Sequence, residues 1–160
     1  MQEEMSAEQV AALLRGEYVP RSPAKRDPST LNQLVIDGLP IPGPGCNPNN
    51  SHCHWSVKLR SVRDQREASH ALAAYELRRK GLPPPNWKIA TVEATFHKPG
   101  NKAKYADGTN LNASLKAAID GLQDAGVIEN DSGIILLPPH QLIGDAADER
   151  KVTLVITKVQ

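Results

Sequence analysis

Hydrophobic and polar residues follow regular patterns over most of the chain after residue 32. Short apolar or alternating runs predict strands over four ranges: 34–39, 88–97, 133–137 and 151–159. Helix-forming stretches with apolar residues every three or four positions predict helices at 61–80 and 110–125. The order strand, helix, strand, helix, strand, strand predicts an α/β (α+β) fold. We expect a small single domain in which two long helices cover a mixed β-sheet.

The first 32 residues differ in pattern from the rest. A capping-box pattern at 6–9 precedes a short apolar stripe at 10–14, which predicts a helix. Residues 17–32 are rich in proline, serine and charge and offer little to bury. We therefore expect residues 1–32 to form an N-terminal helix with a flexible tether, and residues 33–160 to form the domain.

The net charge of the chain is +1, which neither favours nor excludes a nucleic-acid partner, because DNA binding needs only a local basic surface. Basic residues are dense in two segments, 58–66 and 98–104. No apolar run approaches the about 20 residues that cross a membrane. The acidic N-terminus lacks the apolar stretch of a signal peptide. We therefore expect a cytoplasmic protein without a membrane partner.

Two aspartates stand at the ends of the helix predicted at 110–125: Asp107 precedes it and Asp131 follows it. Carboxylates in such loops can converge on a hard cation such as Mg²⁺, which prefers oxygen ligands. Each aspartate also has a structural explanation, Asp107 as a helix cap and Asp131 as a turn residue. Their spacing alone therefore does not establish a metal site.

The residues around this helix form a signature of four segments: Asp107-Gly108-Thr109-Asn110-Leu111, Leu115-Lys116, Asp120-Gly121-Leu122 and the run AGVIENDS at 125–132. The signature resembles the central motif of the RusA-like Holliday-junction resolvases, which are crossover junction endodeoxyribonucleases. Upstream, Asn50 and His54-Trp55 resemble a segment of the phage and prophage members. The resemblance covers about residues 34–160 and is most specific in its central part.

The resemblance implies a homodimeric, Mg²⁺-dependent endonuclease (Mn²⁺ is possible) that resolves four-way DNA junctions in recombination and repair, in a bacterial or phage-infected cell. Matched by position, Asp107, Asp131 and Lys116 are the implied catalytic residues, and Asp107 and Asp131 the implied metal ligands. The implied supporting residues are Thr109, Asn110 and Asn130. The residues expected to bind DNA are His54, Arg60, Arg63, Arg66, Lys98, Lys102 and Lys104.

Two departures from the motif bear on activity. Thr109 stands where the family has a second aspartate, and Asn130 replaces the first of a pair of aspartates. An alternative alignment sets Asn110 and Asn112 opposite the two motif aspartates. Fewer carboxylates weaken Mg²⁺ binding, so a second hypothesis is a RusA-like module that binds branched DNA without cleaving it. A third is a protein-interaction module that uses a helix at 1–16.

Chain lengths limit how the two aspartates can meet. A straight helix of 16 residues spans about 24 Å, and the chain from Gly126 to Asp131 covers roughly 20 Å at most. We therefore expect Asp131 to reach Asp107 within one subunit only if the helix is shorter or bent. A further hypothesis is a dimer whose antiparallel helices bring Asp107 of one chain near Asp131 of the other.

Residues 46–55 allow other interpretations. Cys46, His52, Cys53 and His54 are zinc-ligand types, but their spacing does not match that of structural zinc sites. We prefer a loop near DNA in which His54 contacts a phosphate. For Trp55, a partly buried anchor for the helix at 61–80 is favoured over stacking on a base.

Overall fold

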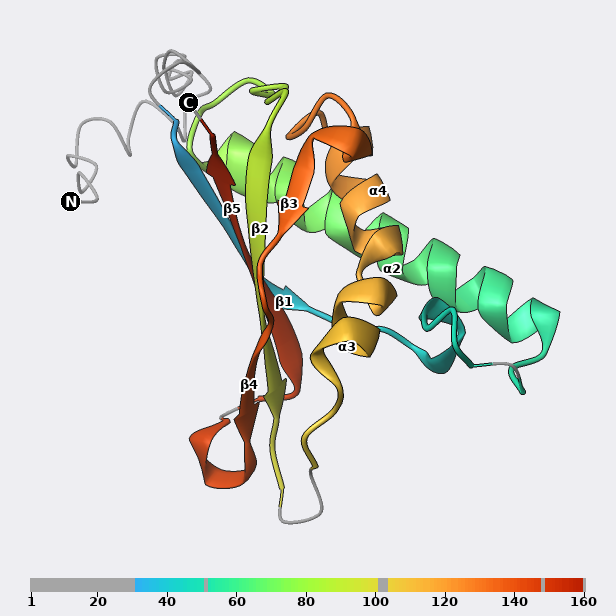
Figure 1. Ribbon diagram of the computed structural model, residues 1–160. Coiled ribbons are helices and arrows are strands. Elements are labelled where there is room, and N and C mark those ends of the chain that lie inside the picture. The colour runs from blue at the N-terminus through green and yellow to red at the C-terminus, as the bar shows by residue number, and fades with distance from the viewer. Residues whose placement is uncertain (1–30, 51, 101–103, 148, 160) are drawn as a thin grey trace, which may run out of the picture.

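The computed structural model describes residues 31–50, 52–100, 104–147 and 149–159 (Figure 1). It is a mixed sheet of five strands with the helices packed on one face, which confirms the predicted α/β (α+β) class. The N-terminal helix and tether predicted for residues 1–32 lie outside the described residues, apart from Leu31 and Asn32 at the end of the tether. Within the described ranges, no helix is both long and apolar enough to cross a membrane.

Strand β2 (Ala90–Lys98) pairs with three of the other four strands of the sheet. These other strands are β1 (Gln33–Leu39), β3 (Ile134–Leu136), β4 (His140–Ile143) and β5 (Lys151–Lys158). Strand β5 lies between β1 and β2 and pairs antiparallel with both, whereas β3 and β4 both pair parallel to β2, one after the other along its edge. The pattern at 133–137 predicts one strand there and none at His140, so β4 is a strand that sequence reasoning missed.

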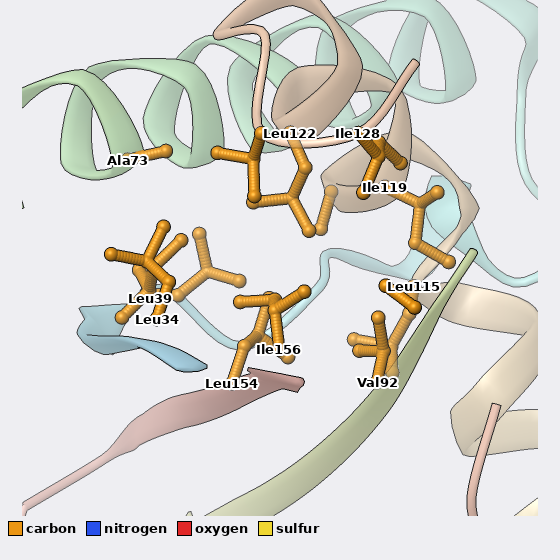
Figure 2. Packing of buried hydrophobic residues seen from close by; sticks show 14 of the residues in the cluster. Leu34, Leu39, Ala73, Val92, Leu115, Ile119, Leu122, Ile128, Leu154 and Ile156 are labelled. Atoms are coloured by element: carbon orange, nitrogen blue, oxygen red, sulfur yellow. The ribbon is translucent and has the colours of Figure 1, made fainter. Parts of the chain in front are cut away.

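Side chains alternate along β2 and β5 between a buried and a partly exposed face. The buried face packs against the helices through aliphatic residues and a single phenylalanine, as Figure 2 shows in part. The largest fully buried side chains include Leu34, Ile36, Phe96, Leu115, Leu122, Leu154 and Ile156. Period-two alternation in the sequence therefore identified the core face of these strands correctly.

The first long helix, α2 (Trp55–Arg79), begins six residues before the predicted start at 61. His54 caps it, because the Nδ1 atom of its ring accepts a hydrogen bond from the backbone N–H of Ser56. The apolar side chains in the added turns (residues 55–60) are exposed. These turns therefore contribute no buried residues to the core, and core packing does not mark where the helix begins.

The predicted helix 110–125 is wrong as a single element, because it is divided into α3 (Gly108–Ser114) and α4 (Lys116–Asp124). At the junction, the backbone N–H of Leu115 bonds to the carbonyl of Asn112, three residues back, and the Ser114 hydroxyl bonds to the carbonyl of Leu111 at 2.7 Å. These local bonds tighten the turn. The Leu115 side chain is fully buried in the core, which fixes the bend.

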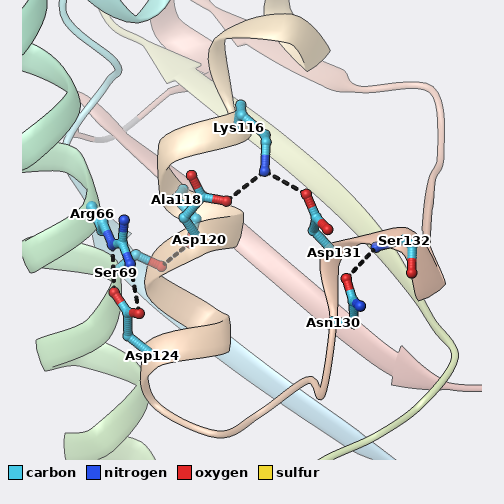
Figure 3. Close-up of polar contacts among 9 residues, drawn as sticks. All are labelled: Arg66, Ser69, Lys116, Ala118, Asp120, Asp124, Asn130, Asp131 and Ser132. Carbon is cyan, nitrogen blue, oxygen red and sulfur yellow. Dashed lines mark hydrogen bonds and ion pairs between the residues drawn. The ribbon is translucent and has the colours of Figure 1, made fainter.

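Helix α4 packs closely on α2 at Gly121. A Cβ atom there would lie 2.3 Å from the Arg66 carbonyl oxygen and 2.8 Å from the Ser69 Cβ. The Ser69 hydroxyl also donates to the Ala118 carbonyl at 2.7 Å, and the Arg66 guanidinium pairs with the Asp124 carboxylate through two hydrogen bonds (Figure 3). The absence of a side chain at Gly121 therefore sets the spacing of the two helices.

We expect Gly121→Ala to lower the free energy of unfolding by about 1–3 kcal/mol, because overpacking outweighs the better helix propensity of alanine. Gln123→Ala, at an exposed position on the same helix, should change it by less than about 0.5 kcal/mol. Chemical denaturation of both variants checks this. Equal or greater stability of Gly121→Ala would contradict the close packing.

Candidate functional site

Lys116, the first residue of α4, lies between two carboxylates (Figure 3). Its Nζ atom is 2.5 Å from Oδ1 of Asp120 and 2.6 Å from Oδ2 of Asp131. Asp120 is one helical turn after Lys116, so the helix itself brings those two side chains together. Asp131 comes from a 3-10 turn (Asp131–Gly133) that follows α4.

Backbone pairing returns the chain from the end of α4 to Lys116. The backbone N–H groups of Asn86 and Trp87 donate to the carbonyls of Gly126 and Val127, and the N–H of Glu129 donates to the carbonyl of Trp87. The segment therefore runs beside the chain that enters β2, and its apolar side chains are buried. This pairing places Asp131 level with the first turn of α4 instead of beyond its end (Figure 3).

Electrostatic attraction links the three charged groups. Hydrogen bonding and attraction to Lys116 lower the pKa of the Asp131 carboxyl below its usual value. The pKa of Lys116 is raised, first by Asp120 and then by Asp131. Lys116 therefore stays protonated and Asp131 ionised throughout the physiological pH range, and the ammonium group balances one of the two negative charges.

Asp107 and Asn110 form hydrogen bonds near the N-terminal end of α3, away from Lys116. The Asp107 carboxylate caps this helix by accepting a hydrogen bond from the backbone N–H of Asn110 at 3.1 Å. The Asn110 side chain accepts a 2.6 Å hydrogen bond from the Asn49 amide, which ties the loop after β1 to α3. Thr109 is exposed on the same helix. The bend at Leu115 does not bring Asp107 into hydrogen-bond contact with Asp131, and their meeting across a dimer stays a prediction.

Asn130 has a local structural role. Its side-chain oxygen accepts a hydrogen bond from the backbone N–H of Ser132 at 3.1 Å, which caps the turn that carries Asp131. Aspartate can cap the same turn.

A cleft of about 300 Å³ opens beside Lys116 and Asp120. One wall is α2, with Lys58 and Val62, and the other is formed by α3 and α4. Its floor is the loop around the 3-10 turn Pro44–Cys46. Gly45 lets this loop lie against α2, since a Cβ there would be 2.6 Å from the Lys58 Cα.

The donor chemistry of this site decides how a metal ion could bind. Among the described residues, no three His, Cys, Asp or Glu side chains lie close enough together to hold a metal ion. Mg²⁺ commonly binds through one or two carboxylates, completing its shell with water and phosphate. The Asp120 and Asp131 oxygens both contact one nitrogen atom, so they are at most about 5.1 Å apart, the sum of those two distances. The side chains fit that open mode of binding.

The basic residues expected to bind DNA differ in their surroundings. Arg66 is engaged by Asp124 in the helix packing, and Lys98 donates to Gln141 at 3.1 Å while burial lowers its pKa. Arg63 lies 3.5 Å from Asp64 on the exposed surface. Arg60 and Lys104 are exposed, and Lys102 lies outside the described residues.

Trp55 and Asp120 differ from what the sequence analysis gave for them. Trp55 is 67% exposed, so its predicted role as a partly buried anchor is wrong: it begins α2 before the helix reaches the core. Asp120 was missed as a site residue, although its spacing of four from Lys116 on a predicted helix is the signal for such a pair.

Replacing Lys116 with methionine should raise the pKa of Asp131 toward its usual value, because the ion pair lowers it. In the wild type, the stabilisation that this pair gives is present at neutral pH and is lost as pH falls below the usual aspartate range, through the lowered pKa. Carboxyl NMR titration measures this directly. Lys158→Met, at an exposed lysine on β5, should leave the Asp131 titration unchanged. An unshifted Asp131 in Lys116→Met would contradict the ion pair.

Comparison with known proteins adds no family assignment. No protein-family model matches the chain, and the search of the curated proteins finds no significant match. The case for a function therefore rests on the side chains of the site.

Proposed function

We propose that the protein is a RusA-like, Mg²⁺-dependent endonuclease that cleaves four-way DNA junctions. The observation that supports this most is the 2.6 Å contact between Lys116 and Asp131. These residues come from two segments of the signature, and the fold brings them together beside an open cleft. A lysine next to a metal-binding carboxylate suits the cleavage of a phosphodiester bond.

In this proposal, Asp131 and Asp120 would hold Mg²⁺, which when bound activates water and offsets charge on the phosphate. Lys116 is 60% exposed and stands at the cleft, so its ammonium group can turn from the carboxylates to a phosphate oxygen. There it would stabilise the negative charge that develops as the bond breaks. Asp107 would act through α3, whose first turn it caps.

The proposed substrate also accounts for the exposed cations. Arg60, Arg63 and Lys104 can contact backbone phosphates, whereas Arg66 is held in the contact between α2 and α4. Such contacts give an affinity that falls steeply as salt rises. A homodimer would present two sites to a substrate with two-fold symmetry, which paired nicks require.

The wild-type chain should nick a mobile four-way junction symmetrically in the presence of Mg²⁺. Asp131→Asn and Lys116→Met should each lower the nicking rate about 100-fold or more, since each removes charge that acts on the transition state. Asp145→Asn, at an exposed aspartate in the 3-10 turn Gly144–Ala146, is the matched control and should keep the wild-type rate. Single-turnover assays with saturating protein separate the rate from binding. Full activity of Asp131→Asn would sink the proposal.

A second candidate function is the binding of branched DNA without cleavage. Thr109 and Asn130 favour it, because they replace two acidic residues of the family motif that would strengthen Mg²⁺ binding.

If this second function holds, the wild type should bind the junction without nicking it. The double variant Thr109→Asp with Asn130→Asp should then gain Mg²⁺-dependent nicking, because it restores the aspartates that the family motif has at these two positions. Asn130→Asp also keeps an oxygen for the Ser132 cap, so the turn should survive. Junction-nicking assays with each single variant identify which carboxylate matters. Robust nicking by the wild type would eliminate this candidate.

A further inference from the structure

The N-terminal half of α2 carries an apolar stripe that nothing covers in the described part of the chain. Trp55, Leu59 and Val62 are 67%, 63% and 39% exposed. Their spacings of four and three place them on one side of the helix, since each residue turns it by about 100°. We call these three residues the α2 ridge.

The α2 ridge continues the buried face of the same helix. Ser69, Ala73 and Leu77 lie along the same side and are buried in the domain. Arg66, paired with Asp124, marks the point where the face passes from buried to exposed. Figure 1 shows why: α2 extends well past the short helix α4, so its first turns project from the domain.

Charge indicates what the α2 ridge would contact. By helical position, Lys58 lies on one side of it and Arg63 on the other, with Arg60 further round. The first turn of α2 has no acidic residue, and the positive end of the helix dipole adds to the basic character. Asp64 and Glu67 near Arg63 are the opposing acids. An exposed apolar ridge between two cations suits a polyanion that also offers apolar faces.

The α2 ridge is also continuous with the candidate site. Val62 and Lys58 form the α2 wall of the cleft whose opposite wall carries Lys116 and Asp120. At the far end of the ridge, the rings of His54 and Trp55 lie 5.6 Å apart in a tilted arrangement, so the exposed aromatic surface is wider than the indole alone. A ligand on the ridge would therefore reach the cleft directly.

We infer that the α2 ridge is a wedge for branched DNA: Trp55 stacks on a base exposed at the branch point, Leu59 packs beside it, and Lys58 and Arg63 contact the flanking phosphates. Apolar side chains that enter an opened base step, and bases that stack on aromatic rings, are general modes of DNA binding. Because it takes branched DNA as the ligand, the inference rests on the proposed function.

The test is equilibrium binding of the full chain to a four-way junction and to a linear duplex of the same sequence, without divalent metal so that no DNA is cut. Trp55→Ala should weaken junction binding about tenfold or more, which is within the range for losing one stacked base, and Trp55→Phe should retain most of it. Duplex binding should change less than about twofold. Tyr75→Ala is the matched control, an aromatic residue 55% exposed in the C-terminal half of the same helix.

Tryptophan fluorescence gives a second readout. Trp87 is only 4% exposed, so quenching by added DNA reports Trp55. The junction should quench this emission more strongly than the duplex does. Because Trp55 is exposed, its replacement should leave the melting temperature unchanged, which excludes misfolding as the cause of weaker binding.

Three outcomes would overturn the wedge: unchanged junction binding by Trp55→Ala, an equal loss on duplex and junction, or a Trp55→Ala chain that is smaller in mass and regains affinity at high concentration. The last result would make the α2 ridge a contact between copies of the chain. Junction nicking with an inert wedge would leave the proposed function standing. Selective quenching of Trp55 emission by the junction, without nicking, would support the wedge and contradict the proposed cleavage.

Discussion

The close contact between α2 and α4 at Gly121 is the constraint on which the candidate site depends. With no Cβ at this position, the two helix backbones meet, and the Ser69 hydroxyl bonds to a carbonyl of α4. The contact fixes the height and rotation of α4, and therefore the point from which Lys116 projects. The Arg66–Asp124 pair lies at the same contact, so a basic residue that the sequence assigned to DNA also holds the helices together.

The second constraint is the return of the chain after α4. Backbone hydrogen bonds between residues 86–87 and 126–129 act as a short parallel bridge, which draws this segment along the helix. Asp131 thus meets Lys116 fifteen residues away in sequence. The Asn130 side chain then fixes the turn, so the position of the carboxylate depends on backbone pairing and a local cap instead of on a long side chain.

Charge balance gives the cluster its character. One ammonium group contacts two carboxylates, and the group as a whole keeps a single negative charge next to an open cleft. Exposed ion pairs add little to stability, because water screens them. In the proposed nuclease, Lys116 would turn to a phosphate while the carboxylates hold a cation. Trp55 is likewise on the surface: its exposed ring contributes little to stability and remains available to a ligand.

The sequence alone determined the fold class, the core faces of β2 and β5, and the capping position of Asp107, because periodicity and local hydrogen bonding depend only on neighbouring residues. Motif matching also singled out Lys116 and Asp131, although the motif does not indicate that they are in contact. Tertiary structure alone decided the break at Leu115, the existence of β4 and the exposure of Trp55. Each depends on contacts with residues distant in the sequence. The Leu115 side chain is buried in a core formed by distant strands, and β4 pairs with an edge of β2. Trp55 is exposed because α2 extends beyond the end of α4, so nothing in the described part of the chain covers it. The partners of Lys116 divide in the same way, since helical spacing encodes Asp120 whereas only the returning chain supplies Asp131.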